Sequence, residues 1–313
     1  MPETYGTDDS FCGRLNPWAQ AFFGPLPALT EPVSLVMSHQ LHQSDRIWSQ
    51  WQVRVGQPTW LTWTLHRVDP AGVFCPPLLL SPDGCWPHVL HSDAMAAVVG
   101  QGVALAWFNR TELAFDAPSC TRQGPVQDRW PEVPWSALSV WAWGLMTCAN
   151  ALSQAEDRGF GKLGAVGHSR GGKAALLAAL LNQRFDAVVA HNSGTGGAAS
   201  LRVVGEGSET LQQLVERYPH WLAPTAADLR MQQQWVDEDA PLPWLANLAP
   251  RGLCVLQAED DLWANPEGTR HLVESLKPMW HTHPHRLCRI ARAGGHAMTT
   301  SDWQQAARFM KRL

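Results

Sequence analysis

The sequence has no pair of cysteines at the spacing that zinc sites use. Its seven cysteines stand singly in a chain of 313 residues, and no two form a Cys-x-x-Cys pair. They are Cys12, Cys75, Cys85, Cys120, Cys148, Cys254 and Cys288. Structural zinc sites need paired thiolates, and disulfide frameworks crowd many cysteines into a short chain. The sequence therefore predicts neither, and its scattered cysteines favour a reducing compartment.

Long runs of one charge and long apolar runs are also absent. The chain carries 24 basic and 28 acidic residues, a net charge of −4. Nucleic-acid surfaces need clustered basic residues, and a membrane span needs about 20 apolar residues. We therefore expect no nucleic-acid partner and no membrane partner. The N-terminus lacks a basic start followed by an apolar stretch, so we expect a cytoplasmic location, or a secreted or periplasmic one if a leader was trimmed.

The chain has enough apolar residues, 45%, to bury one large core, and we expect a single domain over residues 1–313. Strands are predicted at residues 57–68, 76–80, 102–108, 163–166, 185–192 and 251–259. The clearest helix is predicted at residues 135–158, where apolar residues recur at three- and four-residue steps. Strands that alternate with helices predict an α/β fold, with a mainly parallel central sheet flanked by helices on both faces as a three-layer sandwich. An antiparallel strand or hairpin enters this sheet, which is the layout of an α/β-hydrolase fold.

The alternation of strands and helices lapses at about residues 193–249. A glycine-rich stretch, a short helix and a passage with proline and tryptophan occupy this part of the chain. We expect a lid-like insertion over the carboxyl edge of the sheet, where such segments often roof a pocket. A plain surface excursion is the alternative.

The most informative local pattern is Gly-His-Ser-Arg-Gly at residues 167–171, between a predicted strand and a helix-forming run that begins at Lys173. The glycines let the chain reverse direction within a few residues. Strand, sharp turn and helix form a nucleophile elbow, which exposes its serine above the sheet. Ser169 is therefore the predicted nucleophile. The backbone N–H of Arg170 is expected to point to where a carbonyl oxygen gains negative charge.

A serine hydroxyl needs a base within reach and an acid that holds the tautomer of that base. On this fold the chain order is serine, acid, histidine. His296 follows the flexible pair Gly294-Gly295 and precedes a helix predicted to start at Ser301 or Asp302, so it is the predicted base.

The acid is expected where the strand at residues 251–259 runs out into a loop. Three consecutive residues there, 259–261, carry carboxylates. Asp261 is the first choice, because it stands three residues past Ala258, as the aspartate does in the widespread Gly-x-x-Asp acid loop. Asp260 and Glu259 are the alternates, since neighbouring residues on an extended loop point in different directions.

The histidine-rich segment at residues 281–285 has no carboxylate or cysteine at ligand spacing, so we expect a solvated loop there and no metal site. No cofactor is expected either. An oxyanion N–H is also expected from the loop around residues 81–86.

Several segments resemble one family in the right order along the chain. GHSRGGK resembles the Gly-x-Ser-Arg-x-Gly-Lys signature of the glucuronoyl esterases, carbohydrate esterase family 15, and above all their bacterial members. WSALSVWAWGL, NSGTGG and ERYPHW are similar to three further segments of that family. LAPRGLCVLQAEDDLWANPEG and GGHAMTTSDW are similar to its acid strand and its histidine loop.

The resemblance implies hydrolysis of the ester that joins 4-O-methyl-glucuronic acid on xylan to lignin alcohols, through an acyl-enzyme and without a cofactor. It also implies that Arg170 helps to hold the oxyanion, that Lys173 contacts sugar hydroxyls and that Trp263 lies against the sugar. A guanidinium that faces a developing alkoxide supplies charge-assisted hydrogen bonds, which agrees with the role of Arg170. A solvated helix residue is the alternative for Lys173, and a packing residue is the alternative for Trp263.

Two features depart from the family. Some members carry their acid as a glutamate just before the serine-glycine loop, where this chain has Asn192. The region at residues 221–249, where the family places further sugar contacts, is abbreviated. The expected partner is thus a carbohydrate ester or another small-molecule ester. The alternatives are an intracellular esterase for a smaller ester, such as an acetyl ester, and a catalytically silent binding protein.

Overall fold

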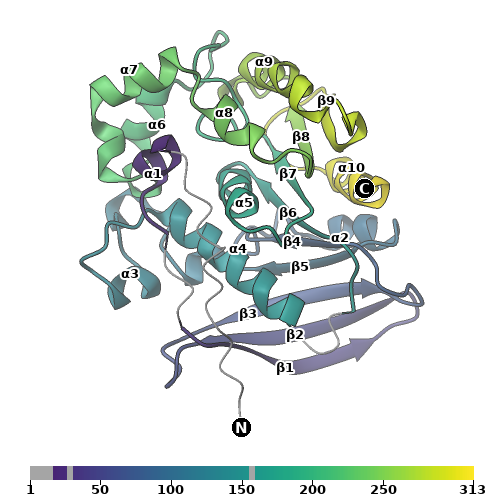
Figure 1. The fold of residues 1–313 in the computed structure, drawn as a ribbon. Helices are drawn as coiled ribbons and strands as arrows, with labels where there is room; N and C mark the ends of the chain where they lie inside the picture. Colours follow the sequence, from purple (N-terminus) through teal and green to yellow (C-terminus); the bar gives the residue numbers. More distant parts are fainter. Residues whose placement is uncertain (1–16, 27–30, 155–158) are drawn as a thin grey trace.

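The computed structural model describes residues 17–26, 31–154 and 159–313 (Figure 1). Cys12 and the N-terminal residues discussed above lie outside the described residues, and the other six cysteines are free thiols. The helix predicted at residues 135–158 is α4 (Ala137–Gln154), and residues 155–158 also lie outside the described part.

Within the described residues one sheet has nine strands in the order β1-β2-β3-β5-β4-β6-β7-β8-β9. Their bounds are β1 (Val33–His42), β2 (Arg46–Val55), β3 (Leu61–Pro70), β4 (Leu78–Ser81), β5 (Ala104–Phe108), β6 (Leu163–His168), β7 (Ala187–His191), β8 (Gly252–Ala258) and β9 (Leu287–Arg292). The pairs β1–β2, β2–β3 and β3–β5 are antiparallel. All the pairs from β5 through β4 to β9 are parallel. The expected parallel sheet with an antiparallel entry is therefore confirmed, but β1, β2 and β9 were not expected.

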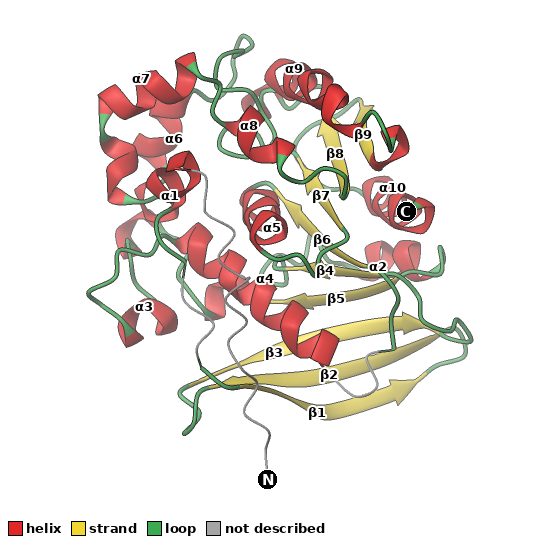
Figure 2. Cartoon of the chain, viewed as in Figure 1, coloured by secondary structure: helices red, strands yellow, loops and turns green. Residues whose placement is uncertain are grey.

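Helices cover both faces of the sheet (Figure 1). On one face, α4 and α5 (Arg170–Leu181) pack against each other and share the larger apolar cluster of the core. On the other face, α2 (Ser92–Val99) and α10 (Thr300–Arg312) pack together over a second apolar cluster. The remaining helices are α1 (Pro17–Phe23), α3 (Pro125–Arg129), α6 (Leu211–Arg217), α7 (Leu229–Asp237), α8 (Pro241–Ala246) and α9 (Pro266–Leu276). Figure 2 shows the resulting three layers, with strands between helices.

Helix α4 is buried on nearly all sides, although its sequence predicts an amphipathic helix. Its residues that are not buried are Asn150, Ser153 and Gln154, all in the last two turns. Small residues allow close packing, since a Cβ on Gly144 would lie 2.3 Å from Leu113 Cδ1. The helix contacts α5, β1, β4 and the 3-10 turn Pro219–Trp221, so its polar-looking face is covered as well.

The segment at residues 193–249 is more helical than its composition predicts. One short helix was expected, and the structure has α6, α7 and α8 there. Aromatic contacts join this segment to α1: Trp18 lies 5.0 Å from Trp244 and Phe22 lies 5.7 Å from Trp235, measured between ring centroids. The segment is thus packed onto the rest of the protein through buried rings, and its role as a lid stays a prediction.

Candidate active site

Ser169 occupies a sharp turn between β6 and α5. Its backbone has φ 55° and ψ −121°, a region that residues other than glycine rarely adopt. The Ser169 N–H donates to the His191 carbonyl at 2.8 Å, and its hydroxyl does not cap the helix. A Cβ on Gly167 would lie 2.2 Å from the Gly171 carbonyl oxygen, so the turn needs glycine there. This strained, tightly packed turn has the geometry of a nucleophile elbow.

We expect Gly171→Ala to lower the free energy of unfolding by about 3 kcal/mol, because overpacking a rigid site forces its neighbours to move. A Cβ at position 171 would lie 2.1 Å from Oδ1 of the buried Asp83. Urea unfolding measures the change. Gly295→Ala is the matched control, since a Cβ there meets nothing within 4 Å. Equal stability of the two variants would contradict the close approach at the elbow.

The histidine loop brings His296 onto one of the three candidate acids. His296 Nδ1 lies 2.6 Å from Asp261 Oδ2. The Asp261 side chain is 7% exposed and the His296 side chain is 47% exposed, so the pair has a buried acid and an open ring. Asp260 instead accepts the Gly294 N–H at 2.6 Å, and Glu259 pairs with Arg289. Of the three carboxylates, Asp261 is the one in contact with the imidazole.

Asn192 fastens the histidine loop to the sheet. Its Oδ1 accepts the Ala258 N–H at 2.8 Å and its Nδ2 donates to the His296 carbonyl at 3.1 Å. Its φ is 42°, a left-handed conformation that asparagine tolerates better than most residues. Where some family members have an acid, this chain therefore has an amide that holds the backbone of the histidine.

A buried polar cluster lies under the ring of His296. His168 Nδ1 and His191 Nδ1 are 2.8 Å apart, so one ring donates and the other accepts. The His168 and His296 ring centroids are 4.6 Å apart. Burial lowers the pKa of His168 far below its usual value, and the neighbouring His191 lowers it further. A neutral imidazole thus packs against the predicted base.

Asp302 closes this cluster from the other side. His191 Nε2 lies 3.3 Å from Asp302 Oδ2, and Arg292 Nε donates to both Asp302 oxygens at 2.9 Å. Burial alone would raise the pKa of Asp302, but its contacts with His191 and Arg292 hold it well below its usual range. Helix α10 begins at Thr300 after the cap Thr299, so the expected start at Ser301 or Asp302 is wrong by one or two residues. Asp302 is instead the third residue of the helix, where its carboxylate completes the capping box.

Arg170 follows the nucleophile as the first residue of α5, with its side chain 25% exposed. Its Nη1 donates to both oxygens of Asp116, at 3.1 and 3.0 Å. Its guanidinium carbon lies 5.0 Å from the Trp86 ring and 4.4 Å from the Trp221 ring. Two indoles and a carboxylate therefore hold the guanidinium beside the elbow. Its oxyanion role stays a prediction.

The loop at residues 81–86 packs against the elbow through Asp83. Asp83 Oδ2 accepts the His168 N–H at 2.7 Å. The backbone N–H groups of Asp83, Gly84 and Trp86 donate to acceptors within the protein, namely Ser81 Oγ and the carbonyls of Phe108 and Asp83. These three N–H groups already have acceptors and Pro82 has none to donate, so the expected oxyanion donor of this loop is Ser81 or Cys85.

Lys173 is buried, with 4% of its surface exposed, so the solvated alternative for this residue is wrong. Its ammonium donates to the Ser193 carbonyl. Burial lowers the pKa of Lys173 to about 8, although the carboxylates of Glu209 and Asp261 oppose the shift. Contact with sugar hydroxyls stays a prediction.

This pKa shift predicts a pH-dependent stability. In the unfolded chain the Lys173 ammonium keeps its proton up to about pH 10.5. In the folded chain the ammonium loses this proton near pH 8. Between these values the unfolded chain binds more protons, so the free energy of unfolding rises with pH by up to about 3 kcal/mol. Lys173→Met should lack this rise when urea unfolding is followed from pH 7 to 10.5. Parallel curves for the two proteins would contradict the buried ammonium.

Glu209 was missed by sequence reasoning. It is 4% exposed, and its Oε1 has no hydrogen-bond partner within the described residues. Burial raises the pKa of Glu209, although Lys173 opposes the rise. The Glu209 N–H donates to the carbonyl of the half-buried Trp263 at 3.1 Å. The guanidinium carbon of Arg217 lies 4.6 Å from the centroid of the Trp263 ring. No local pattern marks Glu209, since it ends a glycine-rich loop far from the elbow in sequence.

Other sequence predictions concern metals and membranes. Across the ranges 17–26, 31–154 and 159–313, no group of three His, Cys, Asp or Glu side chains could hold a metal ion. His281 is exposed on a turn, and His285 is exposed in the 3-10 helix Pro284–Arg286. None of the helices described is both long and apolar enough to cross a membrane.

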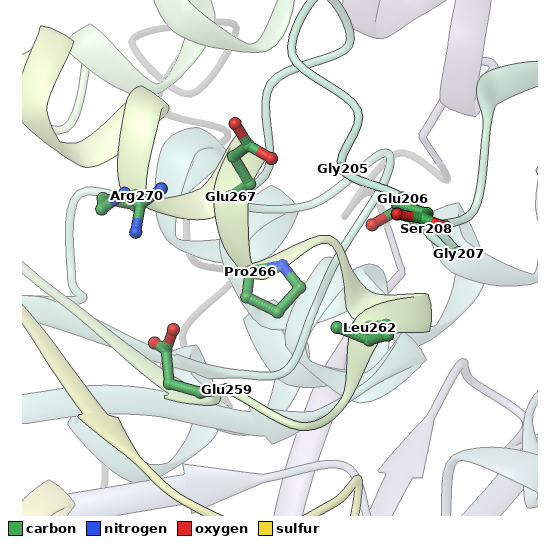
Figure 3. A pocket seen from close by; sticks show the side chains of 9 residues that line it. All are labelled: Gly205, Glu206, Gly207, Ser208, Glu259, Leu262, Pro266, Glu267 and Arg270. Atoms are coloured by element: carbon green, nitrogen blue, oxygen red, sulfur yellow. The ribbon is translucent and has the colours of Figure 1, made fainter.

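A cavity of about 490 Å³ lies beside the acid loop but contains neither Ser169 nor His296. Figure 3 shows its lining, with Pro266 and Leu262 between carboxylates and Arg270 at one side. The residues are Gly205, Glu206, Gly207, Ser208, Glu259, Leu262, Pro266, Glu267 and Arg270. This cavity is therefore separate from the elbow and the imidazole.

The sheet order, the elbow and the histidine loop at the carboxyl edge define an α/β-hydrolase fold. A glucuronoyl esterase of carbohydrate esterase family 15 from Caldicellulosiruptor kristjansonii superposes with a TM-score of 0.76 at 23% identity, over 93% of this chain and 81% of that one. The family model "Glucuronyl esterase, fungi" matches residues 76–283, more than half of the chain. The chain belongs to the glucuronoyl esterase family, as its motifs predicted.

Two relatives illustrate the distance within the family. Carbohydrate esterase MZ0003, from an unknown prokaryotic organism, is 27% identical over an alignment of 241 residues, and the match covers 68% of this chain and 54% of that protein. The 4-O-methyl-glucuronoyl methylesterase of Cerrena unicolor is 25% identical over an alignment of 230 residues, and the match covers 69% of this chain and 48% of that one. The chain thus spans about half the length of these relatives.

Proposed function

We propose that this protein is a serine carboxylic-ester hydrolase that cleaves 4-O-methyl-glucuronoyl esters through an acyl-enzyme. The observation that carries the proposal is the 2.6 Å contact between Nδ1 of His296 and Oδ2 of the buried Asp261. The ring of His296 also packs against His168, the residue that precedes Ser169 at the strained elbow. Family membership and the name of the Cerrena unicolor relative support the glucuronoyl ester as the substrate class.

In the proposed mechanism, Ser169 Oγ attacks the ester carbonyl while His296 Nε2 takes its proton. Asp261 accepts the Nδ1–H of His296, which leaves Nε2 free as the base and stabilises the imidazolium. The Arg170 N–H and guanidinium stabilise the oxyanion of the tetrahedral intermediate. His296 then gives the proton to the leaving alcohol. In the second half, water attacks the acyl carbon while His296 takes its proton, and that proton passes to Ser169 Oγ as the bond to the acid breaks.

We assign sugar recognition to three residues beside the elbow, namely Lys173, Glu209 and Trp263. Lys173 and Glu209 carry opposite charges and interact within the buried part of the site. An ammonium and a carboxylate can bind sugar hydroxyls as donor and acceptor, while the half-buried indole offers a flat apolar face. These contacts would favour a glucuronate over a plain acetate.

The test compares turnover of benzyl glucuronate with that of phenyl acetate, with Ser169→Ala as the blank for each. We expect the glucuronate ester to be preferred by at least about tenfold in kcat/KM, the effect of roughly 1.4 kcal/mol of transition-state binding. Acetate turnover without glucuronate turnover would support the alternative, an esterase for a smaller ester. No turnover of either, together with no labelling of Ser169 by a fluorophosphonate, would support the silent binding protein.

A further inference from the structure

Asp116 gathers contacts from three separate segments of the chain. Its two oxygens accept from Arg170 Nη1 at 3.1 and 3.0 Å, and Trp221 Nε1 donates to it at 2.9 Å. His220 Nε2 lies at 3.3 Å and Arg110 Nη2 at 3.4 Å. Its side chain is 10% exposed. A carboxylate with this many donors is held in one position.

These contacts keep Asp116 charged. Burial alone would raise the pKa of its carboxyl, but the His220 hydrogen bond and the guanidiniums of Arg170 and Arg110 hold that pKa well below its usual range. Asp116 is therefore an anion at any pH at which an esterase is assayed, and its attraction for Arg170 is constant.

Asp116 is also one member of a row of alternating charges around the elbow. Asp83 accepts the His168 N–H and pairs with the fully buried Arg110, which in turn contacts Asp116. Asp116 then binds Arg170. The row begins at the residue before Ser169 and ends at the residue after it, so both neighbours of the predicted nucleophile are tied to one ionic network.

The Arg170 guanidinium keeps a free donor despite these contacts. Asp116 binds Nη1, and the Trp86 and Trp221 rings restrict the plane of the group. Among the described residues, none accepts a hydrogen bond from Arg170 Nη2. The side chain is thus fixed at one nitrogen and open at another, the arrangement that a preorganised donor requires.

We propose that Asp116 is a positioning residue, which fixes the Arg170 guanidinium beside Ser169 so that it meets the oxyanion without reorganising. This inference rests on the proposed function, because it assigns Arg170 to the oxyanion. Asp116 touches no reacting atom, and of the residues that it contacts only Arg170 is next to Ser169 in the chain. Its removal should therefore lower kcat, leave KM nearly unchanged and have no effect once Arg170 is gone.

The experiment is a double-mutant cycle with Asp116→Asn, Arg170→Ala and both together. We expect Asp116→Asn to lower kcat about 10- to 100-fold with KM within about twofold, and Arg170→Ala to lower it about 100-fold. The double variant should lie within about twofold of Arg170→Ala. Turnover of benzyl glucuronate and of phenyl acetate is measured, together with the rate at which a fluorophosphonate labels Ser169. Asp128→Asn, an exposed carboxylate, is the matched control and should react like the wild type.

Losses that multiply in the double variant, or a wild-type kcat in Asp116→Asn, would overturn the proposal. If Asp116→Asn does not fold, Trp221→Phe replaces it in the same cycle, since it keeps a ring over Arg170 and removes only the donor to Asp116. We then expect Trp221→Phe to lower kcat about two- to fivefold, and this loss to vanish in the Arg170→Ala background. A loss that persists in that background would contradict the proposal.

If wild-type Ser169 reacts with neither ester nor probe, the proposed function itself fails. If the wild type reacts and Asp116→Asn reacts equally fast, only the present proposal fails.

Discussion

Replacing Ser169 by alanine should lower kcat at least about a thousandfold and leave the fold intact. The substitution removes only the hydroxyl group, and no other group at the elbow can form the acyl-enzyme. Alanine has the same backbone preferences as serine at φ 55°, so the strain of the turn does not increase. Turnover of benzyl glucuronate measures the loss, and thermal unfolding checks the fold.

Ser301→Ala is the control for that experiment, because Ser301 is exposed on the first turn of α10. It should keep wild-type turnover. If Ser169→Ala kept more than about a tenth of the activity, the nucleophile would have to be sought elsewhere in the chain.

The second large effect is expected at Asp261. An asparagine there removes the negative charge beside His296 Nδ1 and permits the wrong imidazole tautomer, with the proton on Nε2. We expect kcat to fall roughly a thousandfold, as when the acid of such a triad becomes an amide. The folded proportion should not change, because asparagine has nearly the shape of aspartate.

Asp260→Asn and Glu259→Gln are the matched controls, since both residues bear carboxylates on the same loop. Asp260 binds the Gly294 N–H and Glu259 binds Arg289, so neither touches the imidazole. Each control should lose less than about fivefold in kcat. A larger loss in Asp260→Asn than in Asp261→Asn would move the role of acid to Asp260.

Prediction from the sequence succeeded for the strands with continuous apolar runs. β4, β6, β7 and β8 lie inside the sheet, so nearly all their side chains are apolar and the pattern is local. The missed strands are those whose polar residues find distant partners. In β9, Arg289 binds Glu259 and Arg292 binds Asp302, so charges that read as loop residues are paired in a strand.

The same distinction separates β1 and β2 from the rest. Both carry polar and exposed residues, and each is held mainly by its antiparallel partner. Strand pairing depends on segments that lie apart in the chain, and no short window of sequence shows it.

The sequence by itself determined the elbow around Ser169, because strand, glycine turn and helix are consecutive and their sterics are local. It also predicted His296 as the base, from its glycine pair and its place in the chain order. The tertiary structure alone decided that Asp261 rather than Asp260 faces the imidazole and that Asp116 holds Arg170. These contacts join residues 35 and 54 positions apart, and such distances are set by how β8, β9 and α5 pack together and not by any local pattern.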